Sequence, residues 1–203
     1  MSYSLHFADW VPVRVPQVFE FFSNPENLPR LMPPETQTKV EGYQLVPPPP
    51  SPNHDPIANR KAAGTGSIID TTFRPFRWFS WRRKWTAAIV DFEWDHHFID
   101  VQQKGPFKRW RHRHEFITDY RNGFNGTLVR DEIEYEVGFG PLGALANTLM
   151  IEREMRRIFA HRQKVLPELL RSDISIACGE GNSSTGAKQP REMPLQDGLT
   201  RPQ

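Results

Sequence analysis

The sequence predicts an α+β domain that combines an antiparallel sheet of about seven strands with a long C-terminal helix. Two observations predict it. From residue 64 to about 136, segments rich in β-branched and aromatic residues alternate with Gly, Pro and Asn breaks, which is typical of an antiparallel meander. From Pro141 to about Leu170, apolar residues largely follow helical spacing. Ahead of the meander, one strand and two short helices are expected.

The N-terminal elements follow from alternation and from the positions of prolines. Residues of about 3–13 alternate in polarity like a half-buried strand, and Pro16 suits the first turn of a helix. Pro25 starts a second short helix, and a strand is expected at about 36–46. The proline-rich segment 47–56 is interpreted as a surface loop, because its prolines cannot donate to a sheet ladder; a ligand for a proline-recognising protein is the alternative.

The C-terminal half divides into a meander, a helix and a tail. Pro167 either kinks the helix or ends it early. Residues 171–203 contain no aromatic residue and are rich in Ser, Gly, Gln and Pro, so we expect a folded domain over 3–170 and a disordered tail over 171–203. The expected strands of the meander are 64–74, 82–92, 96–104, 109–119 and 126–136.

Composition excludes several classes of protein. A chain of 203 residues can bury a core without staples, and a single cysteine, Cys178, excludes an intramolecular disulfide framework. Neither a secretory signal nor a run of ~18 consecutive apolar residues is visible. The net charge of +2 is too small to indicate a nucleic-acid partner. We therefore expect a cytoplasmic domain that binds no nucleic acid, while its oligomeric state stays open.

The expected strand at the end of Gly105–Phe116 carries the most informative pattern in the chain. Trp110, His112, His114 and Phe116 share one parity, and the positions between them are charged. Successive side chains of a strand point to opposite faces, and charged residues prefer water. The aromatic and imidazole face should therefore look inward. Two histidines on such a face predict a cavity that binds another molecule.

A carboxylate is expected beside these histidines. Asp131 shares the uncharged, inward parity of the last strand, and hairpin pairing would bring it near His112 and His114. Three interpretations stay open: a buried network that fixes the fold, recognition of a ligand's oxygen, and general acid/base catalysis. A metal site of His112, His114 and Asp131 is disfavoured, because no further His, Cys or Glu cluster lies upstream. Adjacent histidines in a polar turn are usually solvent-exposed, so His96 and His97 are expected to be exposed and are given no role.

Aromatic and cationic residues alternate in segment 74–85, at one expected hairpin tip. The plainest interpretation is that the aromatic side chains cap a pocket's mouth while the cations stay solvated. Peripheral contact with an anionic membrane is the main alternative, and stacking on single-stranded nucleic acid is weaker. The residues assigned to the membrane contact are Phe76, Arg77, Trp78, Phe79, Trp81, Arg82 and Arg83.

The order of elements and four motifs resemble the START-like (SRPBCC) superfamily. This group includes polyketide cyclase/dehydrase-like, coenzyme Q-binding and birch-pollen-allergen-type proteins. The motifs are V-R-V-P-Q-V-F-E-F-F-S-N-P-E-N-L-P-R-L-M-P-P (13–34), G-T-G-S-I-I (64–69), G-P-F-K-R-W-R-H-R-H-E-F (105–116) and T-L-V-R-D-E-I-E-Y (127–135). The resemblance implies a helix-grip fold, in which a curved sheet wraps around the C-terminal helix. It also implies one apolar cavity between the sheet and that helix.

We therefore expect a carrier or sensor for a hydrophobic ligand such as a lipid, a quinone or a polyketide-like ring, without a cofactor. The alternative is a cyclase/dehydrase-type enzyme that uses His112 or His114 with Asp131 as acid and base. The expected apolar lining is Trp85, Ile89, Trp110, Phe116, Val129, Ile133, Leu145, Leu149 and Ile158, with His112, His114 and Asp131 at the polar end.

Overall fold

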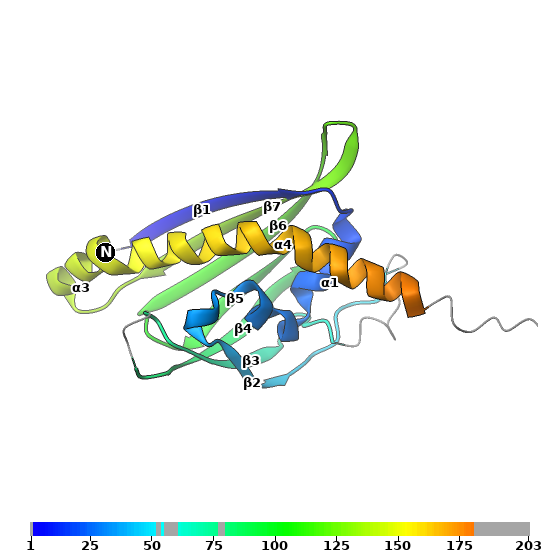
Figure 1. The fold of residues 1–203 in the computed structure, drawn as a ribbon. Coiled ribbons are helices and arrows are strands. Elements are labelled where there is room, and N and C mark those ends of the chain that lie inside the picture. The colour runs from blue at the N-terminus through cyan, green and yellow to red at the C-terminus, as the bar shows by residue number, and fades with distance from the viewer. Residues whose placement is uncertain (1, 52–53, 55–60, 77–79, 181–203) are drawn as a thin grey trace, which may run out of the picture.

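The computed structural model describes residues 2–51, 54, 61–76 and 80–180, and side chains up to residue 173. Its seven strands form one antiparallel sheet in the order β1-β7-β6-β5-β4-β3-β2 (Figure 1). The strands are β1 (Ser2–Val11), β2 (Lys39–Gln44), β3 (Ile68–Phe73), β4 (Arg83–Glu93), β5 (His97–Lys104), β6 (Arg109–Arg121) and β7 (Phe124–Glu136).

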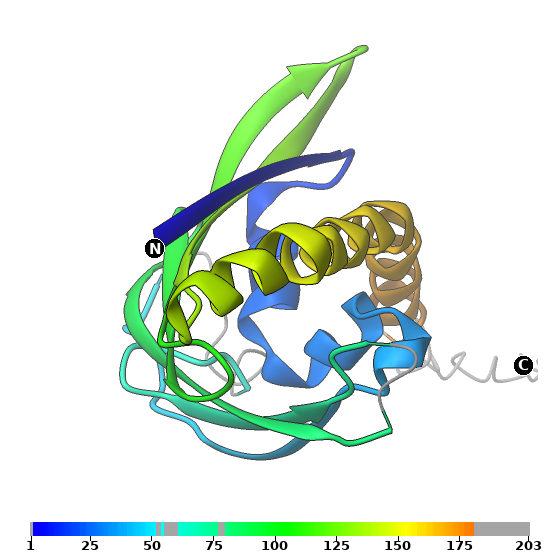
Figure 2. The same cartoon turned by 90° about the vertical axis from the view of Figure 1, so that its left-hand side faces the viewer.

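The helices lie on one face of this sheet. Viewed from the side, the sheet curves around them, so the predicted helix-grip fold is confirmed (Figure 2). The helices are α1 (Val15–Ser23), α2 (Leu28–Leu31), α3 (Gly140–Ala146) and α4 (Glu152–Glu180), with 3₁₀ turns at Pro25–Asn27 and Pro34–Thr36 and a π-helical turn at Asn147–Ile151. No described helix is long and apolar enough to cross a membrane.

Helix α4 ends later than the sequence predicts. It passes through Pro167 and continues to Glu180, because Leu166 and Leu170 are both buried and hold the helix on either side of the proline. Asp173, beyond the expected end, accepts two hydrogen bonds from Arg30 at 2.8 and 2.6 Å. The remainder of the predicted tail, residues 181–203, lies outside the described residues.

A β-bulge bends strand β4. The register against β5 shifts between Ile89 and Asp91, so Val90 has no partner of its own. Bulges increase the local twist of a strand and bend it. Ile89 and Phe92 are both buried, whereas Val90 is 48% exposed. The bulge thus changes which parity of β4 points inward and helps the sheet to curve.

Two apolar clusters fill the interior. One is centred on Phe19 of α1, which packs against Phe92, Phe98 and Phe116 with ring centroids 5.2, 5.9 and 4.9 Å apart. The other cluster comprises Leu5, Ile133, Tyr135 and Met155, with partly buried aromatic side chains around them. Polar side chains separate the two clusters, as described below.

Replacing Phe19 with Ala should lower the free energy of unfolding by ~3–5 kcal/mol, because a fully buried ring is removed and a cavity remains. Urea unfolding followed by circular dichroism measures this loss. The matched control is Phe124→Ala in the 63% exposed position of the β6–β7 hairpin, which should change stability by no more than ~0.5 kcal/mol. Equal losses from the two variants would contradict the assignment of the core.

Candidate functional site

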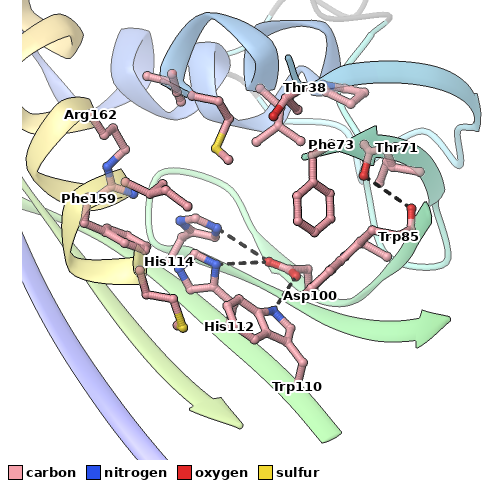
Figure 3. A pocket seen from close by; sticks show the side chains of 18 of the residues that line it. Thr38, Thr71, Phe73, Trp85, Asp100, Trp110, His112, His114, Phe159 and Arg162 are labelled. Atoms are coloured by element: carbon pink, nitrogen blue, oxygen red, sulfur yellow. Dashed lines mark hydrogen bonds and ion pairs between the residues drawn. The ribbon is translucent and has the colours of Figure 1, made fainter. Parts of the chain in front are cut away.

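A cavity of about 600 Å³ lies between the concave face of the sheet and the helices. This volume falls within the ~300–1,000 Å³ typical of small-molecule sites. Strands β3 to β6 supply one wall, and α1, α2 and α4 supply the other. The lining is mostly apolar and aromatic, as Phe73, Trp85, Trp110 and Phe159 illustrate in Figure 3.

Six of the twelve residues predicted for the ligand site line this cavity. They are Trp85, Ile89, Trp110, His112, His114 and Ile158. Three others, Phe116, Val129 and Ile133, belong to the core with exposures of 2% or less. Asp131, 1% exposed, lies behind the two histidines and not on the cavity wall.

Leu145 and Leu149 do not line the cavity: they are 56% and 61% exposed. The π-helical turn over Asn147–Ile151 is the physical reason, because it inserts an extra residue and rotates the helical face. Asn147 becomes buried in their place and accepts a hydrogen bond from the Tyr135 hydroxyl at 2.8 Å. Ile151 then lines the cavity.

A layer of buried polar side chains crosses the interior beside the cavity. On β6, His112 and His114 lie between Trp110 and Phe116, as the alternation of the sequence implies. Across the hairpin, His114 is paired directly with Asp131 of β7. The Nε2 atom of His112 is 2.9 Å from Asp131 Oδ1, and the Nδ1 atom of His114 is 2.8 Å from the same oxygen.

Arg162 of α4 completes this layer from the opposite side. Its guanidinium donates to both oxygens of Asp131, with Nη1 2.9 Å from Oδ1. It also donates to Asp9 of β1, with Nη2 2.8 Å from Oδ2. All three side chains are at most 7% exposed. Sequence reasoning missed Arg162 and Asp9, although Arg162 shares the buried helical face of Met155 and Leu166.

The pKa values of these groups reflect a balance between burial and the charges of neighbouring side chains. Burial alone would raise the pKa of Asp131, but Arg162 and the two imidazoles hold that pKa well below its usual value. Burial and the neighbouring His114 lower the pKa of His112. Burial also acts to lower the pKa of His114, yet Asp100 and Asp131 outweigh it and raise the pKa. The pKa values of these two neighbouring histidines are therefore shifted in opposite directions.

Asp100 of β5 brings a second carboxylate to the histidines, on the cavity side (Figure 3). Its Oδ2 is 3.5 Å from His112 Nδ1 and 3.6 Å from His114 Nε2. Trp110 Nε1 donates to its other oxygen at 3.3 Å. The sequence did not point to Asp100, because its contact depends on the β5–β6 register, which pairs Asp100 with His112.

Among the described residues, two groups of three have metal-ligating atoms within 4.8 Å of one another. One is Asp100, His112 and His114, at the cavity wall. The other is Glu93, His96 and His97, near the β4–β5 turn. His97 is only 8% exposed there, and its Nε2 is 3.0 Å from Asp91 Oδ2. The expectation that both turn histidines are solvent-exposed is therefore wrong for His97.

The aromatic and cationic segment 74–85 lies partly at the cavity. Phe76 and Arg83 line it, and Arg82 donates to the Thr72 carbonyl oxygen at 3.0 Å. Trp81 is 70% exposed. Arg77, Trp78 and Phe79 lie outside the described residues, so membrane contact by this segment stays a prediction.

Replacing Arg162 with Met should lower the free energy of unfolding by ~3–5 kcal/mol, because Asp9 and Asp131 would stay buried without a cation. Arg156→Met is the matched control on the same helix: Arg156 pairs with Glu152 at an exposed position, and its loss should cost at most ~0.5 kcal/mol. Chemical unfolding of both variants tests this. A loss below ~1 kcal/mol for Arg162→Met would contradict the assigned role.

No family model and no curated protein matches the sequence. Solved structures do resemble the fold. The protein TTHA0849 of Thermus thermophilus has a TM-score of 0.57 at 14% identity, over 84% of this chain and 99% of that one. Norcoclaurine synthase from Thalictrum flavum has a TM-score of 0.52 at 13% identity, over 82% and 94%.

A START superfamily protein from Mycobacterium smegmatis gives a TM-score of 0.52 at 13% identity, over 84% of this chain and 97% of that one. Identities this low show the fold alone. The chain thus has the START-like fold to which its motifs pointed, without a subfamily being shown.

Proposed function

We propose that this protein binds a hydrophobic ligand that carries one polar group, and holds it in the cavity between the sheet and α4. The observation that carries the proposal is the cavity itself: about 600 Å³, lined chiefly by apolar side chains, with His112, His114 and Asp100 gathered on one wall. Apolar walls supply the binding free energy, and a few convergent polar groups fix the orientation of the ligand.

The shape of the wall favours a ring over a simple acyl chain. Trp110 packs edge-on against Trp85 with ring centroids 5.0 Å apart, and Phe107 lies 5.2 Å from Trp110. Aromatic faces and edges favour stacked or edge-on contacts with a further ring. Of the classes expected from the sequence, a quinone or a polyketide-like ring suits this wall best. Norcoclaurine synthase, a protein of similar fold, is described in complex with dopamine and hydroxybenzaldehyde.

The polar wall would then hold an oxygen of the ring. His112 and His114 both line the cavity, and Asp131 lies behind them, 2.9 Å from His112 Nε2 and 2.8 Å from His114 Nδ1. An imidazole N–H donates to a carbonyl or phenolate oxygen. The same groups could move a proton at that oxygen, which is the cyclase/dehydrase alternative. Turnover of a bound ring compound would favour that alternative over a carrier.

Filling the cavity should weaken ligand binding without unfolding the protein. Ala87 of β4 lines the cavity, so Ala87→Trp should weaken binding of a naphthoquinone probe at least tenfold. Quenching of tryptophan fluorescence measures the affinity, and isothermal titration calorimetry checks the variant with its extra tryptophan. Val90→Trp, at the outward bulge of the same strand, is the control and should bind like the unaltered protein.

Native mass spectrometry of the purified protein complements this titration by revealing any co-purified apolar molecule. The proposal fails if no apolar compound co-purifies and the probe does not bind. It fails equally if Ala87→Trp and Val90→Trp bind the probe with the same affinity.

A further inference from the structure

We propose that Asp100, His112 and His114 form a binding site for one divalent transition-metal ion of the zinc class, with an open coordination position toward the cavity. This site goes beyond the proposed function, because an apolar ligand can occupy the cavity without an ion. The sequence disfavoured a metal site of His112, His114 and Asp131, because no further His, Cys or Glu cluster lies upstream. The structure supplies Asp100 from the neighbouring strand.

The spacing of the three donor atoms suits a shared ion better than hydrogen bonds. Asp100 Oδ2 lies 3.5 Å from His112 Nδ1 and 3.6 Å from His114 Nε2. Such distances are too long for ordinary hydrogen bonds. Zinc binds imidazole nitrogen and carboxylate oxygen at ~2.0–2.2 Å in tetrahedral geometry, which places two ligand atoms about 3.3–3.6 Å apart. The observed separations already lie within that range.

The orientation of His112 directs its second ring nitrogen at Asp100. An ionised Asp131 can only accept hydrogen bonds, so the Nε2 atom of His112 donates to Asp131 Oδ1 at 2.9 Å. The Nδ1 atom, on the other side of the ring, faces Asp100 Oδ2 at 3.5 Å. In a neutral imidazole that donates from Nε2, Nδ1 carries the lone pair that a metal ion between the ring and the carboxylate would bind.

His114 offers the second nitrogen. Its Nε2 points to the same oxygen of Asp100 (Figure 3). Its Nδ1 is buried and lies close to Asp131, but it forms no hydrogen bond with acceptable geometry among the described residues. The imidazole is thus placed by Asp131 without being tied to it, and a small rotation can bring Nε2 to the ion.

Asp131 and Arg162 form the support that such a site needs. Histidine ligands usually direct the nitrogen remote from the metal to a carboxylate, which fixes the ring and makes it a better ligand. Asp131 does this for His112 and lies beside His114, and Arg162 fixes Asp131 in turn. Both Asp131 and Arg162 are buried, so this support is rigid.

The balance of charge also favours a divalent cation. Arg162 pairs with Asp9 and Asp131, whereas Asp100, a third carboxylate, lies beside the two histidines. A divalent ion bound between them would offset the charge of Asp100. All three proposed ligands line the cavity, so the fourth position of a tetrahedral ion would be open to an oxygen of a bound molecule.

The test is a metal titration of the full-length protein after treatment with a chelator, with no organic ligand present. Co²⁺, which takes zinc sites and absorbs visible light there, is the probe, and Zn²⁺ is added in competition. We expect one equivalent of Co²⁺ to give a tetrahedral absorption spectrum that Zn²⁺ removes. Asp100→Asn should weaken binding at least 100-fold while keeping the shape of the side chain and the acceptor for Trp110.

His96→Gln is the matched control, because it disables the other three-residue group near the β4–β5 turn. It should leave the affinity and the spectrum unchanged. His112→Gln should behave like Asp100→Asn; if it fails to fold, Asp100→Asn still decides. The absence of saturable binding would overturn the proposal, and so would binding that Asp100→Asn leaves intact. Probe binding by the metal-stripped protein tests the cavity separately, so the two proposals can fail independently.

Discussion

The rest of the structure depends on the contact of Arg162 with Asp131 and Asp9. One buried guanidinium on α4 binds a carboxylate on β7 and another on β1, and so joins the long helix to two neighbouring strands. Without the guanidinium, burying each of these two carboxylates would cost several kcal/mol of desolvation free energy. The helix is therefore held at one position along the sheet. This position also determines where the side chains of α4 lie in the cavity.

This contact lies in a polar layer between two apolar clusters. Along β6 the chain passes from Trp110 in one cluster, through His112 and His114, to Phe116 in the other. Helix α4 does the same, with Phe159 on one side of Arg162 and Leu166 on the other. A shift of the helix by one turn would place an apolar side chain against the buried carboxylates. The layer thus selects one packing from several that hydrophobicity alone would allow.

The sequence predicted the parts of this site that depend on local periodicity. Alternation placed His112 and His114 on the inward face, and hairpin pairing placed Asp131 behind them. Asp100 and Arg162 could not be found in this way, because their contacts depend on a strand register and on how α4 docks. The prediction that Leu145 and Leu149 line the cavity was wrong, because helical spacing assumes an unbroken α-helix and the π-helical turn interrupts it.

The bulge at Val90 has a consequence for how the protein can diverge. Before the bulge, the inward side chains of β4 meet the cavity at Trp85, Ala87 and Ile89; beyond it, Phe92 packs against Phe19. The part of β4 before the bulge therefore shapes the cavity, and the part after it packs against α1. Substitutions in the first part can change which molecule fits the cavity, while the second part still holds α1 in place. Related chains could therefore acquire a new ligand specificity through substitutions before the bulge, without changing the core packing after it.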